Sequence, residues 1–108
     1  MGLYVAFQYK IAETSARGDR WEIQIAGYRF ALWNASVSEI ISYHWHPVGV
    51  SAVTTPHLHL GPGALVGRDE LKAAHLPTGA IALAGVIRLA IADLGVVPRR
   101  SDWAEVLQ

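Results

Sequence analysis

The sequence predicts an α+β protein, with a mostly antiparallel sheet of about five strands and a C-terminal helix packed on one face. Two observations lead to this fold class. Apolar and polar side chains alternate with a period of two in the first half of the chain, and the second half changes to a helical period. The chain has 108 residues, of which 52% are hydrophobic, so we expect one core and a single domain over residues 1–108.

The first three strands are expected before residue 34. Residues 3–11 alternate apolar and polar side chains, which predicts a strand with one buried face, and a turn follows at residues 15–19. Residues 21–25 form the second expected strand. Residues 26–27 are Ala-Gly, which is typical of a tight turn or of a bulge within one long strand. We favour the turn, with residues 28–33 as the third strand.

The next two strands contain four of the five histidines. A turn over residues 34–36 leads to the fourth expected strand, residues 39–46. Pro47 ends that strand because proline has no N–H for the hydrogen-bond ladder. Residues 55–60 form the fifth strand. The Gly-Pro-Gly tripeptide at residues 61–63 then predicts a flexible connector, since it lacks the Gly-Lys-Ser/Thr ending of a phosphate-binding loop.

The C-terminal part is predicted to be helical. A short helix is expected over residues 69–75. Thr78 is a natural N-cap for a longer helix that runs to about Leu94, with Gly95 just past its end. A last short helix is expected to contain Trp103 and to be capped by Ser101 or Asp102.

The longer helix is expected to be apolar on both sides. Its core face is a broad apolar stripe, and its back is smooth, with Arg88 and Asp93 as the charged residues. A smooth apolar surface is typical of a buried interface. We therefore expect the chain to form a homo-oligomer through the back face of the helix over residues 79–95.

Charge and composition argue against several classes of protein. Nine Lys and Arg balance nine Asp and Glu, so the chain lacks the basic footprint of a nucleic-acid-binding protein. It has no cysteine, which excludes disulfides and thiolate sites and fits a reducing compartment. Arg88 and Asp93 interrupt the apolar stretch over residues 79–97, and residues 1–5 lack the basic region of a signal peptide. We expect a cytoplasmic protein with no membrane association.

Two His-x-His pairs, His44/His46 and His57/His59, carry the functional prediction. Side chains alternate between the two faces of a strand, so both rings of each pair point to the same side. Burial of the intervening apolar residues under the helix puts all four rings on the opposite face. In the expected antiparallel register, His46 lies opposite His57 and His44 lies opposite His59, with Cβ atoms about 5 Å apart.

Three interpretations of this histidine face stay open. In the first, the rings are polar residues on an open sheet face. In the second, three or four imidazoles bind zinc or another divalent transition metal, in a non-enzymatic metal-binding or protein-interaction domain or in a catalytic site. In the third, two histidines act as general acid and base on an RNA phosphodiester without a metal. Four residues are then candidates to stabilise the phosphate: Lys10, Arg29, Tyr4 and Tyr28.

The fifth histidine, His75, is expected to have a different role. It ends the short helix predicted over residues 69–75. At that position an imidazole interacts with the last carbonyl groups and with the helix dipole. We therefore expect His75 to be structural and not a fifth ligand.

Three segments of the chain resemble a family of bacterial toxins. The run Ile-Ser-Tyr-His-Trp at residues 41–45 is followed by Thr-Pro-His-Leu-His at residues 55–59 and by a helix introduced by Pro-Thr-Gly at residues 77–79. This pattern is similar to the TumE-like toxins of toxin–antitoxin modules, which are small α+β proteins with an aromatic strand, a Pro-His-x-x-His-like cluster and a C-terminal helix. The histidines at residues 57 and 59 are more tightly spaced than in that pattern.

The resemblance covers residues 38–95 and has consequences for function. It implies a cytoplasmic toxin that acts on RNA and is neutralised by a DNA-binding antitoxin. The catalytic residues of such a ribonuclease would be His44, His46, His57 and His59.

Overall fold

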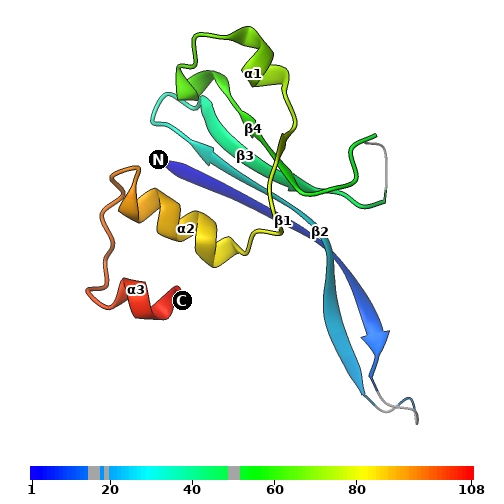
Figure 1. Cartoon of the computed structure of the whole chain (residues 1–108). Helices are drawn as coiled ribbons and strands as arrows, with labels where there is room; N and C mark the ends of the chain where they lie inside the picture. Colours follow the sequence, from blue (N-terminus) through cyan, green and yellow to red (C-terminus); the bar gives the residue numbers. More distant parts are fainter. Residues whose placement is uncertain (15–17, 19, 49–51) are drawn as a thin grey trace.

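The computed structural model describes residues 1–14, 18, 20–48 and 52–108. Within these residues, five strands form one antiparallel sheet in chain order, with helices after the fourth strand (Figure 1). The predicted α+β class is confirmed. The strands are β1 (Gly2–Glu13), β2 (Trp21–Trp33), β3 (Glu39–Trp45), β4 (His57–Leu60) and β5 (Leu76–Pro77), and the helices are η1 (Pro62–Ala64), α1 (Asp69–Ala73), α2 (Leu83–Ala92) and α3 (Trp103–Val106).

β2 is one long strand, so the turn predicted at residues 26–27 is wrong. Gln8 pairs with Gly27 and Tyr9 pairs with Ile25, which leaves Ala26 as the extra residue of a β-bulge. Gly27 is buried, and a Cβ there would lie 2.7 Å from the carbonyl oxygen of Trp45. The glycine allows β2 to approach β3 closely and does not form a turn. Most of the turn predicted at residues 15–19 lies outside the described residues.

β5 is a strand that the sequence did not predict. Its two residues pair with β4, and Thr78 N–H donates to the carbonyl oxygen of Pro56 at 3.1 Å. Thr78 therefore continues the sheet contacts, and its predicted role as an N-cap is wrong. α2 begins later, at Leu83, after Ala82. Proline is tolerated in β5 because the strand lies at the edge of the sheet.

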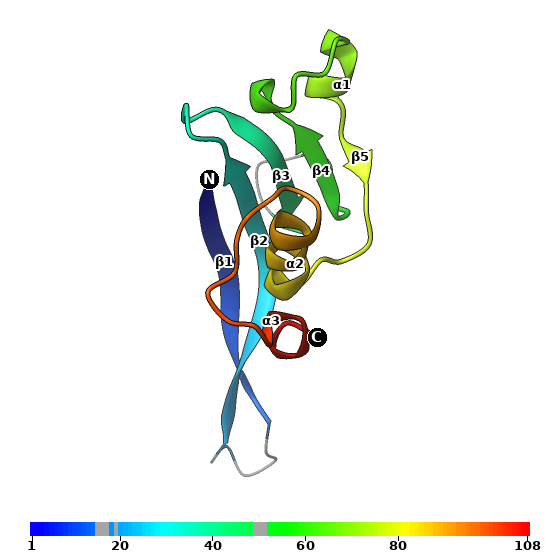
Figure 2. The same ribbon diagram turned by 90° about the vertical axis from the view of Figure 1, so that its left-hand side faces the viewer.

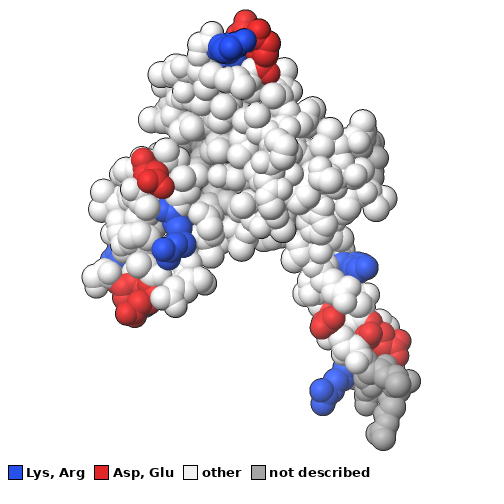
Figure 3. Space-filling view, viewed as in Figure 1, with Lys and Arg blue, Asp and Glu red and all other residues white. Residues whose placement is uncertain are grey.

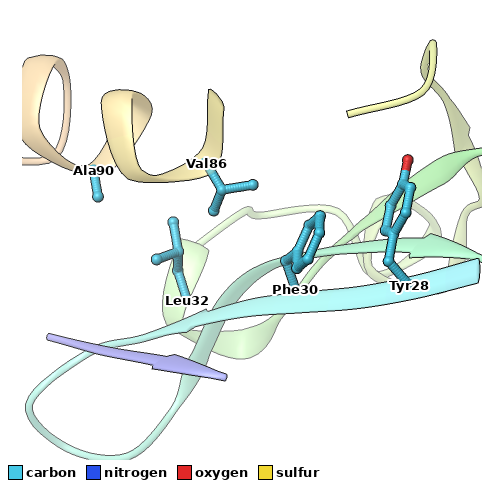
Figure 4. Close-up of a cluster of buried hydrophobic side chains, with 5 residues drawn as sticks. All are labelled: Tyr28, Phe30, Leu32, Val86 and Ala90. Carbon is cyan, nitrogen blue, oxygen red and sulfur yellow. The ribbon is translucent and has the colours of Figure 1, made fainter. Parts of the chain in front are cut away.

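The core lies between β2 and α2. Tyr28, Phe30 and Leu32 point from the strand toward Val86 and Ala90 on the helix (Figure 4). The rings of Tyr28 and Phe30 stack with centroids 4.7 Å apart. The predicted packing of a C-terminal helix on one sheet face is confirmed, and α2 lies in front of the sheet in Figure 2.

The two ends of α2 are held by specific contacts. Before the helix, Ile81 N–H donates to the Tyr28 hydroxyl at 2.9 Å. After the helix, Gly95 has a φ of +77°, as its position past the helix end predicted, and Val96 N–H donates to the carbonyl oxygen of Ala90 at 3.0 Å. The first contact ties the start of α2 to the sheet, and the second ends the helix.

Part of the back of α2 faces α3. Arg88 Nη1 donates to the carbonyl oxygen of Ala104 at 2.9 Å, and its guanidinium carbon lies 5.9 Å from the ring centroid of Trp103. Leu89 of the same helix packs against the core cluster. Asp102 is at the N-cap position of α3, but its side chain makes no capping hydrogen bond, because its carboxylate accepts from Arg100 at 2.9 and 2.8 Å. No helix among the described residues is both long and apolar enough to cross a membrane.

Candidate metal centre

The sheet register brings the histidines together on the face opposite α2. His44 pairs with His57, and Ser42 pairs with His59. The predicted register, with His46 opposite His57, is therefore wrong by two residues. A shift of two preserves which side chains share a face, so the predicted histidine face is unchanged.

A glycine at the end of β4 explains the observed register. Gly61 N–H donates to the carbonyl oxygen of Ile40 at 2.9 Å. Gly61 is buried, and a Cβ at this position would lie 2.7 Å from the carbonyl carbon of Glu39. Only a residue without a side chain allows this approach, so β4 can pair with β3 at this point of the chain.

Three of the four predicted site histidines form a compact triad, His44, His57 and His59. One ring nitrogen from each lies within 4.8 Å of the others. The ring centroids are 4.9 Å apart for His44 and His59, and 5.1 Å apart for His57 and His59. His57 is only 3% exposed. Imidazoles so arranged on adjacent strands can share one metal ion.

Each ring of the triad is oriented by a second group. His57 Nδ1–H donates to the carbonyl oxygen of Thr55 at 2.8 Å, which leaves the lone pair on Nε2. His44 Nε2 lies 2.7 Å from the hydroxyl of Ser42, a residue that is 1% exposed. His59 forms a hydrogen bond with the Ala74 backbone. Hydrogen-bond partners such as these orient the imidazoles that bind metals in proteins.

Burial and mutual repulsion keep two of the rings neutral. Burial lowers the pKa of His44 from 6.5 to about 4, with smaller contributions from the charges of His59, Arg29 and other histidines. Burial also lowers the pKa of His59, assisted by His75 and opposed by the Ala74 hydrogen bond. Rings with lowered pKa values are neutral at pH 7, which is the state that binds a metal.

The other two histidines lie at the border of the triad. His46 follows the last residue of β3, and its ring centroid is 5.6 Å from that of His44. His75 lies outside α1, which ends at Ala73, so its predicted place at a helix end is wrong. Its ring is 4.9 Å from His57 and 4.6 Å from His59. The unpredicted pairing of β5 with β4 brings it there.

Two of the predicted phosphate contacts share the histidine face. Arg29 pairs with His44 in the sheet, and its guanidinium lies 5.5 Å from the ring centroid of Tyr4. Arg29 Nη2 also forms an ion pair with Glu39 at 3.5 Å. Lys10 lies farther along the β1–β2 hairpin, opposite Gln24, and the fourth candidate, the tyrosine at position 28, is in the core.

No protein-family model, curated protein or solved structure matches this chain. The TumE-like resemblance stays a prediction.

Proposed function

We propose that this protein binds one divalent transition metal, zinc foremost, through His44, His57 and His59. The observation that carries the proposal is the convergence of three oriented imidazoles within 4.8 Å on one sheet face. Tetrahedral zinc holds nitrogen ligands at about 2.0–2.1 Å, which corresponds to about 3.4 Å between ligands. Small side-chain rotations close that gap. An all-imidazole set favours zinc, copper or nickel over magnesium or calcium.

A tetrahedral zinc ion held by these three histidines would have a fourth coordination position for another ligand or water. A zinc ion held by three histidines lowers the pKa of a bound water to about 7, which supports hydrolysis at neutral pH. The chain's own contribution is to keep His44 and His59 neutral and to hold His57 in one tautomer through Thr55. The same contribution serves a non-enzymatic metal-binding role.

Calorimetric titration of metal-stripped, untagged protein with zinc tests the proposal. We expect one zinc per chain, and His44→Ala or His59→Ala to lower the affinity at least about 100-fold, since each removes a ligand outright. His46→Ala is the matched control, because its ring lies beyond the triad. No zinc binding in the parent, or equal losses in all three variants, would contradict the proposal.

A second candidate function is a ribonuclease-type toxin activity that uses histidine general acid–base catalysis and is neutralised by an antitoxin protein. Arg29 favours it: the residue lies beside His44, and among the described residues its Nε is buried without a hydrogen-bond partner. A guanidinium at this position can bind an RNA phosphate. A pKa of about 4 makes His44 a weak general base at pH 7, which places this function second.

The two functions differ in their need for metal. RNA cleavage in the presence of a chelator, with growth arrest on expression that His44→Ala and Arg29→Gln both relieve, supports the toxin. Intact RNA and normal growth with the parent protein would rule it out.

A further inference from the structure

His75 approaches the triad from a separate part of the chain. It follows α1 and immediately precedes β5, and its ring lies 4.9 Å from His57 and 4.6 Å from His59. The triad residues come from β3 and β4. His75 is thus the one described histidine that joins a third segment to the cluster.

The sheet imposes this approach. His57 pairs with Pro77 and Leu58 pairs with Leu76, and one further step of the same antiparallel register, just before the first residue of β5, would put His75 opposite His59. Directly opposed residues share a face. The hydrogen bond between His59 and the Ala74 backbone also places residue 74 beside the His59 ring. The position of His75 is therefore set by the backbone, while its exposed ring can rotate toward His57 and His59.

We propose that His75 is the fourth ligand of the metal centre, and that metal binding fastens the segment with α1 to the sheet. The inference rests on the proposed metal function. Residues 61–75 leave the end of β4 and return to it, so a metal shared by His59 and His75 closes this loop at its base. An exposed fourth ligand can also be exchanged for water, which would free the coordination position that His75 occupies.

Zinc affinity and trypsin digestion of the full chain test the inference together. Trypsin cleaves after Arg68 and Lys72, whose side chains are 75% and 39% exposed within the segment. Cleavage after exposed Arg99, outside the segment, is the internal reference. Proteolysis of a folded chain reports how often the segment opens.

The expected result is a combined loss in His75→Ala. In the parent, zinc should slow trypsin cleavage after Arg68 relative to cleavage after Arg99. His75→Ala should lose this protection, and its affinity for zinc should be at least about tenfold lower than that of the parent. His46→Ala should retain both. A parent that binds zinc while His75→Ala keeps full affinity and protection overturns the inference and leaves the triad standing. A parent that binds no zinc overturns both.

A second, independent observation concerns the far half of the β1–β2 hairpin, residues 9–13 and 21–25, here called the arm. The arm extends away from the body of the molecule in both ribbon views (Figures 1 and 2). Tyr9 pairs with Ile25 and Ile11 pairs with Ile23, so these side chains share a face with Trp21. They are 47% to 68% exposed. These side chains form an apolar face that the described part of the molecule leaves uncovered.

We infer that the arm faces of two copies of this chain pack together in a dimer. A large side chain has about 150–250 Å² of surface, so at these exposed fractions the five residues leave roughly 600 Å² exposed on each chain. A standard interface buries about 800 Å² per partner. The arm has one positive side chain, Lys10, and two negative ones, Glu13 and Glu22, and the neighbouring Arg20 balances them, so a second copy meets no net repulsion. Figure 3 shows both signs along the arm.

Sedimentation across a concentration series tests the dimer. The parent should dimerise in the micromolar range, and Ile23→Lys should be monomeric at the same concentrations. Gln24→Lys is the matched control, because this neighbouring residue lies on the opposite face of the strand, and it should still dimerise. A parent that is monomeric throughout, or one that pairs solely with a different protein, overturns the inference.

Discussion

The substitution Ser42→Ala distinguishes the effect of a buried hydroxyl on folding stability from its effect on the orientation of His44. Ser42 is 1% exposed, and its Oγ lies 2.7 Å from His44 Nε2. Ser42→Ala removes this oxygen with almost no change in volume and leaves the ring nitrogen without its partner. Because the His44 ring is half-buried, the loss is that of an ordinary hydrogen bond, about 0.5–1.5 kcal/mol of folding free energy. Loss of a group that orients a metal ligand costs about 10- to 100-fold in metal affinity.

Urea unfolding of the metal-free protein and zinc titration of the folded protein measure the two effects. Ser36→Ala is the matched control, because Ser36 is exposed and uses its backbone N–H, not its hydroxyl, to donate to Asn34 Oδ1. It should change stability by less than about 0.5 kcal/mol. If Ser42→Ala is destabilised but keeps its zinc affinity within about twofold, the reasoning that Ser42 orients a ligand is refuted.

Three further predictions concern stability, each measured by urea unfolding. Gly61→Ala should lose about 1–3 kcal/mol, because its Cβ meets backbone, whereas Gly79→Ala, with nothing within 4 Å, should be neutral or slightly stabilised. Phe30→Ala should lose about 3–5 kcal/mol, because Phe30 is fully buried, and Phe7→Ala, at 42% exposure, should lose less. Metal-free protein should lose stability as the pH falls from 6.5 to about 4, because His44 is protonated more readily when unfolded.

Each of these three predictions has an expected magnitude and an outcome that would contradict it. Linkage gives about 3 kcal/mol for His44, which solvent screening of the half-buried ring reduces to about 1–2 kcal/mol. Equal pH dependence in His44→Ala would contradict that assignment. Equal losses for Gly61→Ala and Gly79→Ala would contradict the close approach of β4 to β3. Equal losses for Phe30→Ala and Phe7→Ala would contradict the position of the core.

The parts of the fold that depend on local patterns could be predicted from the sequence. Alternation placed β1, β3 and β4 and the face on which the histidines lie, although it divided β2 in two and missed β5. The turn at residues 34–36 was also predictable, because Asn34 Oδ1 accepts from the N–H groups of Ser36 and Ser38, both at 3.0 Å. The glycine at position 95 predicted the end of the longer helix, and it has the positive φ that favours glycine there.

The remaining features depend on contacts between distant residues. Gly27 has the local appearance of a turn residue, but its role is to let β2 approach Trp45. The register of β3 and β4 is fixed by Gly61 against Glu39, which no periodicity shows. His75 reaches the cluster through a two-residue strand, too short to leave an alternating pattern. Sequence reasoning could therefore find the face on which the histidines lie, but not which histidines come together on it.

Anomalous diffraction at the zinc absorption edge, from crystals grown with zinc, tests the metal centre most directly. We predict one strong peak on the sheet face opposite α2, about 2.0–2.1 Å from ring nitrogens of His44, His57 and His59. Crystals that show no peak at this face, or a zinc held elsewhere by surface carboxylates, would contradict the proposed function.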